Sequence, residues 1–356
     1  MKKLTIVTLA LILLAACGGD AEPAEILAAG ESPTTTAAPV AEPVETTAPE
    51  SEVVETTAPN TPATMMTEDL VYHSGGEPMT STSGLVDVIA PSEEGPFPTV
   101  VVFHGDPRNA GKSWHRSDAR QIAEQGRVVF LPTWGKVETS AYQDLGTQAV
   151  WDLSVRELKC AVAFARAHTE DFGGDPDHIT LYGLSAGGNA VLMAGLADAE
   201  PLDTCAVDGP SVSVQALVPI DADWTMGGSW DTDLEENPEA FYSITPFRFL
   251  DGSQDIPIHV MVTEIVGSYT RSVEPDPAES WLSYRHPDID LVADLAERGF
   301  LDDGKFGLRE SGEYAHQILT EAGYDASLIL MPGADHVVWG EEGTALVVET
   351  VLNAEG

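Results

Sequence analysis

Short apolar runs rich in β-favouring residues alternate along the chain with longer stretches of helical periodicity. The apolar runs predict strands at residues 85–89, 99–103, 128–131, 179–182, 212–220, 257–263 and 326–331. The periodic stretches predict helices at residues 117–125, 148–168, 190–197 and 341–353. Because strands that alternate with helices form a mostly parallel sheet covered on both faces, the pattern predicts an α/β fold.

Two long segments interrupt this alternation, at residues 221–255 and 265–311. Both are rich in Asp, Pro, Trp and Tyr, and both follow the end of a predicted strand. Ligand sites of open α/β sheets lie at the carboxyl ends of the strands. We therefore expect the two segments to be cap-like insertions near a functional site.

Residues 17–68 differ in composition from the rest of the chain. They are mostly Ala, Pro, Thr and Glu, and the sequence Glu-Thr-Thr-Ala-Pro at residues 45–49 recurs at residues 55–59. Such a segment buries too little apolar surface to offset its conformational entropy. The composition predicts a disordered, extended tether, followed by a folded domain at residues 69–356.

The first 16 residues have the pattern of an export signal. Lys2 and Lys3 precede an apolar run at residues 4–14, which is too short to span a bilayer. The Leu-Ala-Ala-Cys sequence that ends at Cys17 resembles the lipobox of bacterial lipoproteins. This resemblance implies cleavage before Cys17, a lipid on its sulfur, and an extracytoplasmic protein anchored to the bacterial cell membrane.

Charge and cysteine content narrow the range of partners and compartments. The formal net charge is −41, from 58 acidic and 17 basic residues, which argues against nucleic acid as a partner. Beyond Cys17, only Cys160 and Cys205 are available for pairing. In an oxidising compartment they form either a disulfide, which we favour, or two buried free thiols.

The candidate nucleophile is Ser185. It lies in Gly-Leu-Ser-Ala-Gly at residues 183–187, between a predicted strand and a predicted apolar helix. A direct turn from strand to helix leaves no room for side chains two residues before and after the serine, which explains both glycines. The serine hydroxyl is then raised at the edge of the sheet, beside the positive end of a helix.

A serine nucleophile needs a base, and the base needs a carboxylate to orient it. His336 follows the last predicted strand in a short loop with a glycine, and it is the predicted base. For the acid we favour Glu264, directly after the strand at residues 257–263, over Asp276 in the same loop, and others such as Asp302 stay open. No His-x-x-x-His or Cys-x-x-Cys spacing suggests a metal site.

The predicted oxyanion hole consists of two backbone N–H groups, those of Asp106 and Ala186. His104 and Gly105 end the strand at residues 99–103, and in a parallel sheet the loop that begins there lies beside Ser185. Each such donor stabilises the transition state by about 3 kcal/mol.

Four motifs together resemble the α/β-hydrolases, and most closely secreted esterases of the carboxylesterase and hormone-sensitive-lipase type. They are His-Gly at 104–105, Phe-Gly-Gly-Asp-Pro at 172–176, Gly-Leu-Ser-Ala-Gly-Gly at 183–188 and Gly-Ala-Asp-His at 333–336. The resemblance implies a Ser–acid–His hydrolase that cleaves esters without a cofactor. The chain departs from it where Asp106 and Pro107 replace glycines and where the usual acid motif is absent. The competing interpretations are a peptidase or amidase of the same fold and a non-catalytic binding module.

Overall fold

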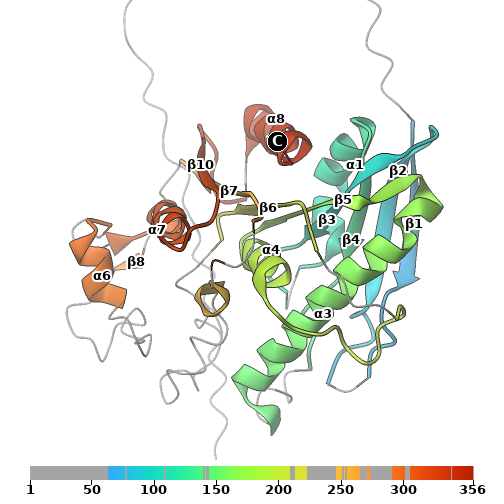
Figure 1. The fold of residues 1–356 in the computed structure, drawn as a ribbon, viewed down its shortest axis with the longest axis horizontal. Helices are drawn as coiled ribbons and strands as arrows, with labels where there is room; N and C mark the ends of the chain where they lie inside the picture. Colours follow the sequence, from blue (N-terminus) through green and yellow to red (C-terminus); the bar gives the residue numbers. More distant parts are fainter. Residues whose placement is uncertain are drawn as a thin grey trace, which may run out of the picture. The chain divides into compact units, whose positions relative to one another are not determined.

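An eight-stranded sheet forms the centre of the protein (Figure 1), in the strand order β1-β2-β4-β3-β5-β6-β7-β10. The computed structural model describes residues 63–76, 78–107, 110–138, 141, 144–208, 213–222, 246–250, 252, 255–264, 271–272, 291–300, 305–337 and 339–355. The β1–β2 and β2–β4 pairs are antiparallel. All other neighbours in the sheet are parallel, so the sheet is mostly parallel, as predicted.

The strands of this sheet are short, and most of their residues are buried. They are β1 (Thr64–Val71), β2 (Leu85–Pro91), β3 (Phe97–Phe103), β4 (Val128–Pro132), β5 (Gly174–Leu184), β6 (Ala216–Ile220), β7 (Ile258–Thr263) and β10 (Ala326–Met331). Every residue of β4 and β6 is buried, as expected for parallel strands covered on both faces.

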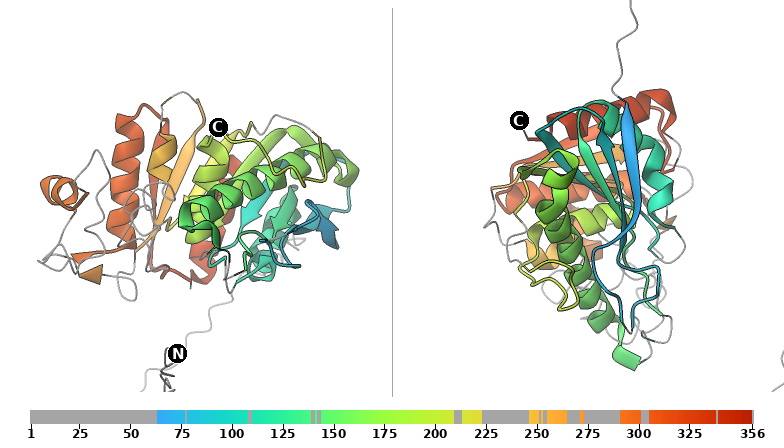
Figure 2. Two further views of the ribbon diagram at one scale, coloured as in Figure 1. Left: turned by 90° about the horizontal axis from the view of Figure 1, so that it is seen from below. Right: turned by 90° about the vertical axis from the view of Figure 1, so that its right-hand side faces the viewer.

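Helices cover both faces of the sheet (Figures 1 and 2), with α1 and α8 on one face and α3, α4 and α7 on the other. These helices are α1 (Arg116–Glu124), α3 (Thr147–His168), α4 (Ala186–Leu196), α7 (Leu308–Glu321) and α8 (Gly340–Asn353). Short 3-10 helices are η1 (Lys112–His115), η2 (Thr169–Phe172) and η4 (Pro246–Phe249). No helix among the described residues is both long and apolar enough to cross a membrane.

Two hydrophobic cores lie on the two faces of the sheet. Val101 and Phe103 of β3 belong to the core under α3, α4 and α7, whereas Val100 and Val102 belong to the core under α1 and α8. This division follows from strand geometry, in which successive side chains point to opposite faces. A continuous apolar run is therefore what a central strand of this sheet requires.

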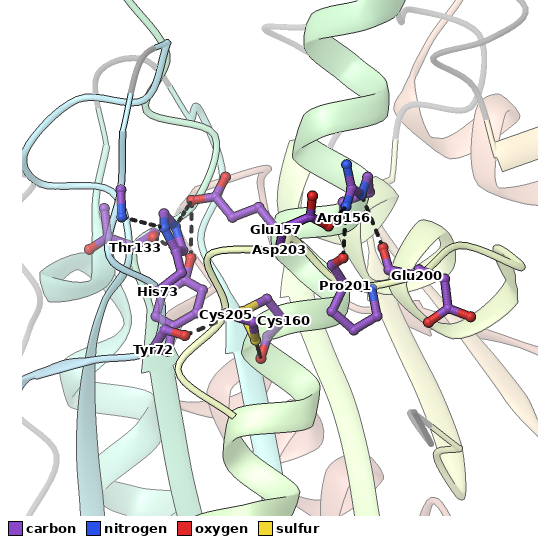
Figure 3. The surroundings of a disulfide bond; sticks show 11 residues. Tyr72, His73, Thr133, Arg156, Glu157, Cys160, Glu200, Pro201, Asp203 and Cys205 are labelled. Atoms are coloured by element: carbon purple, nitrogen blue, oxygen red, sulfur yellow. Dashed lines mark hydrogen bonds and ion pairs between the residues drawn. A yellow bond between two sulfur atoms is a disulfide. The ribbon is translucent and has the colours of Figure 1, made fainter. Parts of the chain in front are cut away.

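A disulfide joins Cys160 of α3 to Cys205, in the loop after α4 (Figure 3). The same loop pairs with the segment after β1, through a bridge between His73 and Cys205. Arg156, one turn before Cys160, donates to the backbone oxygen of Pro201 at 3.0 Å. The disulfide spans 45 residues, and closing a loop of that length stabilises the folded state by about 4 kcal/mol in the chain-entropy model.

The structure differs from the prediction at two elements. Strand β1 begins at Thr64, within the stretch that the composition assigned to the tether. Helix α7 (Leu308–Glu321) was not predicted, and its first turn lies inside the expected insertion at residues 265–311. The rest of that insertion includes α6 (Leu291–Glu297) and a small pair of strands, β8 (Arg271–Ser272) and β9 (Lys305–Phe306).

Candidate active site

The candidate site lies at the edge of the sheet where the parallel strands β3, β5, β6, β7 and β10 end. Ser185 follows β5, Asp221 follows β6, and Glu264 follows β7 directly. His336 lies in the loop between β10 and α8. Because carboxyl ends of parallel strands share one edge, the sheet brings these four positions to the same side of the molecule.

Ser185 occupies a sharp turn between β5 and α4. Its backbone has φ 59° and ψ −124°, a strained conformation for a residue with a side chain. The turn is held by its backbone N–H, which donates to the carbonyl oxygen of Ile220 at 2.9 Å. Ala186 is the first residue of α4, where backbone N–H groups point out of the helix. The hydroxyl therefore lies beside the positive end of α4.

Both flanking glycines are required by close backbone contacts. A Cβ on Gly183 would lie 2.5 Å from the carbonyl oxygen of Gly187. A Cβ on Gly187 would lie 2.1 Å from the carbonyl oxygen of Phe103. The predicted reason for the glycine spacing, a strand that turns directly into a helix, is confirmed.

His336 is hydrogen-bonded to a buried carboxylate, that of Asp221. The distance from His336 Nδ1 to Asp221 Oδ2 is 3.0 Å, and both side chains are buried. Since an ionised carboxylate only accepts hydrogen bonds, Nδ1 carries the proton in this pair. The loop around the imidazole is held by the N–H of His336, which donates to Asp335 Oδ1 at 2.7 Å.

Asp221 is held by the strand that separates it from His336. Its carboxylate accepts hydrogen bonds from the N–H and the hydroxyl of Thr263, each at 2.8 Å. Thr263 is the last residue of β7, which lies between β6 and β10 in the sheet. The carboxylate of Asp221 thus reaches across the end of β7 to the imidazole. The residue before Asp221 is Ile220, whose carbonyl binds Ser185, so the Asp–His pair adjoins the serine turn.

The structure pairs His336 with a carboxylate other than the one we favoured from the sequence. Glu264 is exposed, and its Oε2 accepts a hydrogen bond from the N–H of Gly333 at 2.7 Å. It therefore contacts the beginning of the histidine loop and not the imidazole. Asp276 and Asp302 lie outside the described residues. The sequence signal for Asp221 is its position directly after a fully apolar strand, at the first residue of the predicted insertion at residues 221–255.

The loop after β3 lies against Ser185. A Cβ on Gly105 would lie 3.3 Å from the Cβ of Ser185, so only glycine fits at this position without a shift. His104 Nδ1 donates to the carbonyl oxygen of Gly105 at 2.8 Å. Because the peptide group is planar and trans, its N–H, on Asp106, points the opposite way. The hydrogen bond from His104 therefore fixes the orientation of the Asp106 N–H.

The tautomer of His104 follows from its two contacts. Its Nε2 accepts a hydrogen bond from the backbone N–H of Trp134 at 3.3 Å, so Nδ1 is the protonated nitrogen. Burial lowers the pKa of His104 from 6.5 to about 4. The imidazole is therefore neutral at physiological pH, and its Nδ1–H donates the hydrogen bond that holds the Gly105 carbonyl.

Protonation of His104 links the stability of the fold to pH. Between pH 6.5 and about 4 the unfolded chain binds a proton that the folded protein excludes, so stability falls as the pH is lowered through this range. When the pH is lowered from 7 to 5, the free energy of unfolding of the wild type should fall by about 2 kcal/mol more than that of His104→Asn. The variant keeps a donor near the Nδ1 position but has no group that titrates there. Urea unfolding of both proteins at the two pH values measures this difference. An identical pH dependence would contradict it.

The described residues were also considered as possible metal ligands. Within the described part of the chain, no three or more histidine, cysteine or carboxylate side chains are grouped so that they could hold a metal ion.

Comparison with known proteins places this chain near esterases. The family model BD-FAE matches residues 86–224, which include the serine turn and Asp221. The chain is 28% identical over 160 residues to the esterase LipQ of Mycobacterium tuberculosis, which covers 43% of this chain and 34% of LipQ. It is 38% identical over 90 residues to the esterase LipC of the same organism, covering 25% of this chain and 21% of LipC. The match thus spans about a third or less of these relatives.

Solved structures extend the likeness to most of the chain. A truncated carbohydrate esterase from gut microbiota superposes with a TM-score of 0.56 at 14% identity, covering 84% of this chain and 98% of that one. A thermophilic esterase, Est2 of Thermogutta terrifontis, gives a TM-score of 0.54 at 14% identity, covering 83% and 95%. The protein has the α/β-hydrolase fold. In this fold the serine turn follows β5, and the carboxylate that contacts His336 follows β6.

Proposed function

We propose that the protein is a serine hydrolase that cleaves carboxylic esters through an acyl-enzyme intermediate. The observation that carries the proposal is the buried hydrogen bond between Asp221 and His336, beside the strained turn of Ser185. A non-catalytic binding module has no need for a buried Asp–His pair, whose burial costs free energy. The esterases among the relatives support the ester as the bond that is cleaved.

In the proposed mechanism Ser185 Oγ attacks the ester carbonyl carbon, and its proton passes to His336 Nε2. The negative charge that develops on the carbonyl oxygen is stabilised by the N–H groups of Asp106 and Ala186. His336 then gives the proton to the alkoxide oxygen as the C–O bond breaks, and the alcohol leaves. Asp221 keeps the imidazole in the Nδ1–H tautomer and stabilises it when it is protonated.

The second half of the cycle repeats these steps with water. A water molecule attacks the carbonyl carbon of the acyl-enzyme and gives its proton to His336. Collapse of the tetrahedral intermediate breaks the bond to Ser185 Oγ, which takes the proton back. The carboxylic acid is released, and the free enzyme is restored.

The common acyl-enzyme can be tested by partitioning. Several esters of one acid, with different alcohols, are hydrolysed in the presence of methanol, and the ratio of methyl ester to free acid is measured. The proposal predicts one ratio for all the esters, because each forms the same intermediate. A ratio that changes with the leaving alcohol would contradict the intermediate. Turnover of anilides at rates comparable to those of esters would favour an amidase, and no turnover of either would favour the binding module.

We also propose that the chain is exported and anchored by a lipid on Cys17, with the stretch between Cys17 and strand β1 as the tether. The support is in the sequence alone: Lys2, Lys3, the apolar run at residues 4–14 and the lipobox-like ending. Metabolic labelling with an alkynyl fatty acid in a bacterial host is expected to label the wild type and not Cys17→Ala. Equal labelling of both proteins, or none of either, would contradict the anchor.

A further inference from the structure

The segment after β4 contacts the loop after β3 at the first residue of that loop. The structure describes residues 104–107 and 110 of this loop, and we call them the oxyanion loop. The backbone N–H of Trp134 donates to His104 Nε2 at 3.3 Å. The indole Nε1–H of Trp134 donates to the carbonyl oxygen of His104 at 3.0 Å. Trp134 thus binds both the side chain and the backbone of the residue that orients the Gly105 carbonyl.

The next two residues contact the same loop further along. Gly135 has φ +66°, and a Cβ on it would lie 2.6 Å from the Cβ of Pro107. Lys136 Nζ donates to the carbonyl oxygen of Ala110. Three consecutive residues therefore pack against the loop that carries the Asp106 N–H. We call residues 133–136 the bracing segment.

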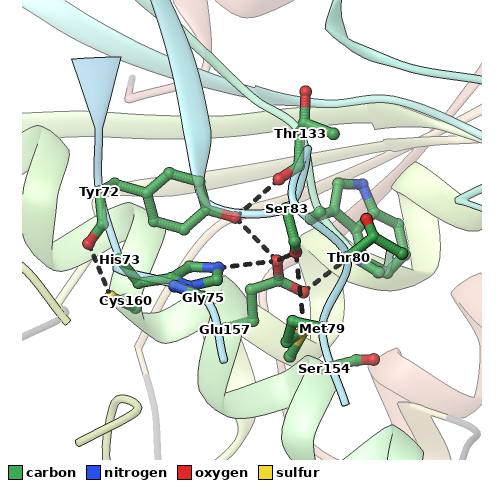
Figure 4. A network of polar contacts seen from close by, with 12 residues as sticks. Tyr72, His73, Gly75, Met79, Thr80, Ser83, Thr133, Ser154, Glu157 and Cys160 are labelled. Carbon is green, nitrogen blue, oxygen red and sulfur yellow. Dashed lines mark hydrogen bonds and ion pairs between the residues drawn. The ribbon is translucent and has the colours of Figure 1, made fainter. Parts of the chain in front are cut away.

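One buried carboxylate, that of Glu157 on α3, holds the bracing segment in place (Figure 4). Its Oε2 accepts a hydrogen bond from the backbone N–H of Gly135 at 2.8 Å. Its Oε1 accepts from the hydroxyls of Tyr72 and Ser83 and lies 3.1 Å from Nε2 of His73. The side chains of Glu157 and His73 are fully buried.

All the groups around this carboxylate act as donors. His73 Nδ1 accepts from the N–H of Gly75 at 3.0 Å, so the proton of the neutral ring is on Nε2, facing Glu157. Burial and the charge of Glu157 raise the pKa of Tyr72, which keeps its hydroxyl protonated. The single hydrogen of that hydroxyl is shared between Glu157 Oε1, 3.1 Å away, and the carbonyl oxygen of Thr133, 2.8 Å away at the start of the bracing segment.

We propose that Glu157 is a positioning residue for the oxyanion hole, acting through the bracing segment on the Gly105–Asp106 peptide. The proposal rests on the proposed serine-hydrolase function. It assigns to the segment after β1 a part in the active site, because Tyr72, His73 and Ser83 fill the other side of the same carboxylate. A donor displaced by even a fraction of an ångström stabilises the oxyanion less well.

Glu157→Gln removes the contact to the bracing segment selectively. Three donors converge on Oε1 and one on Oε2, so the amide places its oxygen toward the three and its NH₂ toward the N–H of Gly135. Two donors then face each other at this position, and the bond to Gly135 is lost. The variant keeps the size and shape of the side chain.

We expect Glu157→Gln to lower kcat for ester hydrolysis by about 10–100-fold, with KM changed by less than about threefold, because a displaced oxyanion donor weakens the transition state and not substrate binding. The inhibition constant of a trifluoromethyl ketone, which forms a tetrahedral adduct, should rise by the same factor as kcat/KM falls. Binding of the product acid should not change.

The matched control is Glu170→Gln. Glu170 is exposed and lies in η2, before the start of β5, at the opposite end of that strand from Ser185. We expect this variant to keep kcat within about threefold of the wild type. Values for all variants are normalised to the folded fraction measured by circular dichroism.

A second variant tests the same segment from the other side. Gly135→Ala introduces a Cβ against Pro107 in a backbone conformation that favours glycine. It should also lower kcat with little change in KM. Because both substitutions act on one segment, the double variant should lose less than the product of the two single effects.

Two results would overturn the proposal. One is a Glu157→Gln enzyme with wild-type kcat and wild-type affinity for the trifluoromethyl ketone. The other is a loss of kcat in Glu170→Gln as large as that in Glu157→Gln, which would show that the effect does not depend on the bracing segment. Failure of the proposed function itself is recognised separately, because the wild type would then neither hydrolyse esters nor bind the ketone.

Discussion

Replacing Ser185 with alanine is expected to lower kcat for ester hydrolysis by about 10⁵–10⁶-fold, the largest effect of any single substitution. The substitution removes the proposed nucleophile, while the His336–Asp221 pair and the proposed oxyanion donors remain. Some residual rate over the uncatalysed reaction should survive, because the proposed oxyanion hole would still bind the transition state. Initial rates with a p-nitrophenyl ester at saturating concentration measure the effect.

The control for this experiment is Ser92→Ala. Ser92 is an exposed serine beyond the end of β2, and because β2 runs antiparallel to β4 it lies at the opposite edge of the sheet from Ser185. Its replacement should leave kcat unchanged. A Ser185→Ala enzyme with more than about 1% of wild-type kcat would show that the hydroxyl is not the nucleophile.

The second large effect is expected at Asp221 and distinguishes it from Glu264. Asp221→Asn keeps the size of the side chain, but its amide either donates to His336 Nδ1 or accepts without a charge. In both cases the imidazolium that forms during the reaction loses its counter-charge, and kcat should fall by about 10⁴-fold. The N–H and hydroxyl of Thr263, which now hold the carboxylate, keep the variant folded around an acceptor oxygen.

Glu264→Gln is the matched control for Asp221→Asn. Its amide oxygen can still accept the hydrogen bond from Gly333, and the residue is exposed, so kcat should stay within about threefold of the wild type. Equal losses in the two variants, or a larger loss in Glu264→Gln, would show that the acid was assigned to the wrong residue. Initial rates with one ester, measured side by side, decide between them.

The two ends of the candidate triad could be predicted from the sequence because each depends on local geometry. A strand followed directly by a helix requires glycines around Ser185, and the contacts of Gly183 and Gly187 show why. His336 lies in a short loop between the last strand and the last helix, so its place in the sheet follows from chain order. Neither inference required knowing how far apart two elements distant in the sequence lie in the fold.

The acid could not be predicted in the same way. Its identity depends on whether a carboxylate can reach across the end of β7, and that depends on the side chain of Thr263 and on the path of the chain after β6. Glu264 directly follows β7, the strand beside β10, which made it the favoured candidate from the sequence. Its carboxylate instead accepts a hydrogen bond from the backbone N–H of Gly333. Carboxylates are abundant in this part of the chain, so residue type alone did not distinguish them.

Strand β1 and helix α7 were missed for different reasons. Strand β1 is mostly exposed, and its four apolar residues fall in two separated pairs, Met65–Met66 and Leu70–Val71, so it shows neither a continuous apolar run nor strict alternation. Helix α7 has a capping box and buried residues at helical spacing, but it contains Gly312, which lowers helix propensity. A Cβ at Gly312 would lie 2.0 Å from Val262 Cγ1, so the glycine allows α7 to pack closely on β7. Tertiary packing outweighs local propensity in this helix.

Catalysis by this protein is proposed to need Ser185 and His336 together. The most direct test is to treat the protein with a fluorophosphonate and to locate the adduct by mass spectrometry of the digested chain. We expect one phosphonyl group per molecule, attached to Ser185, and labelling that is slower by at least about 100-fold in His336→Gln. A wild-type protein that takes up no label, or that carries it on another residue, would contradict the proposed mechanism, as would His336→Gln labelled at the wild-type rate.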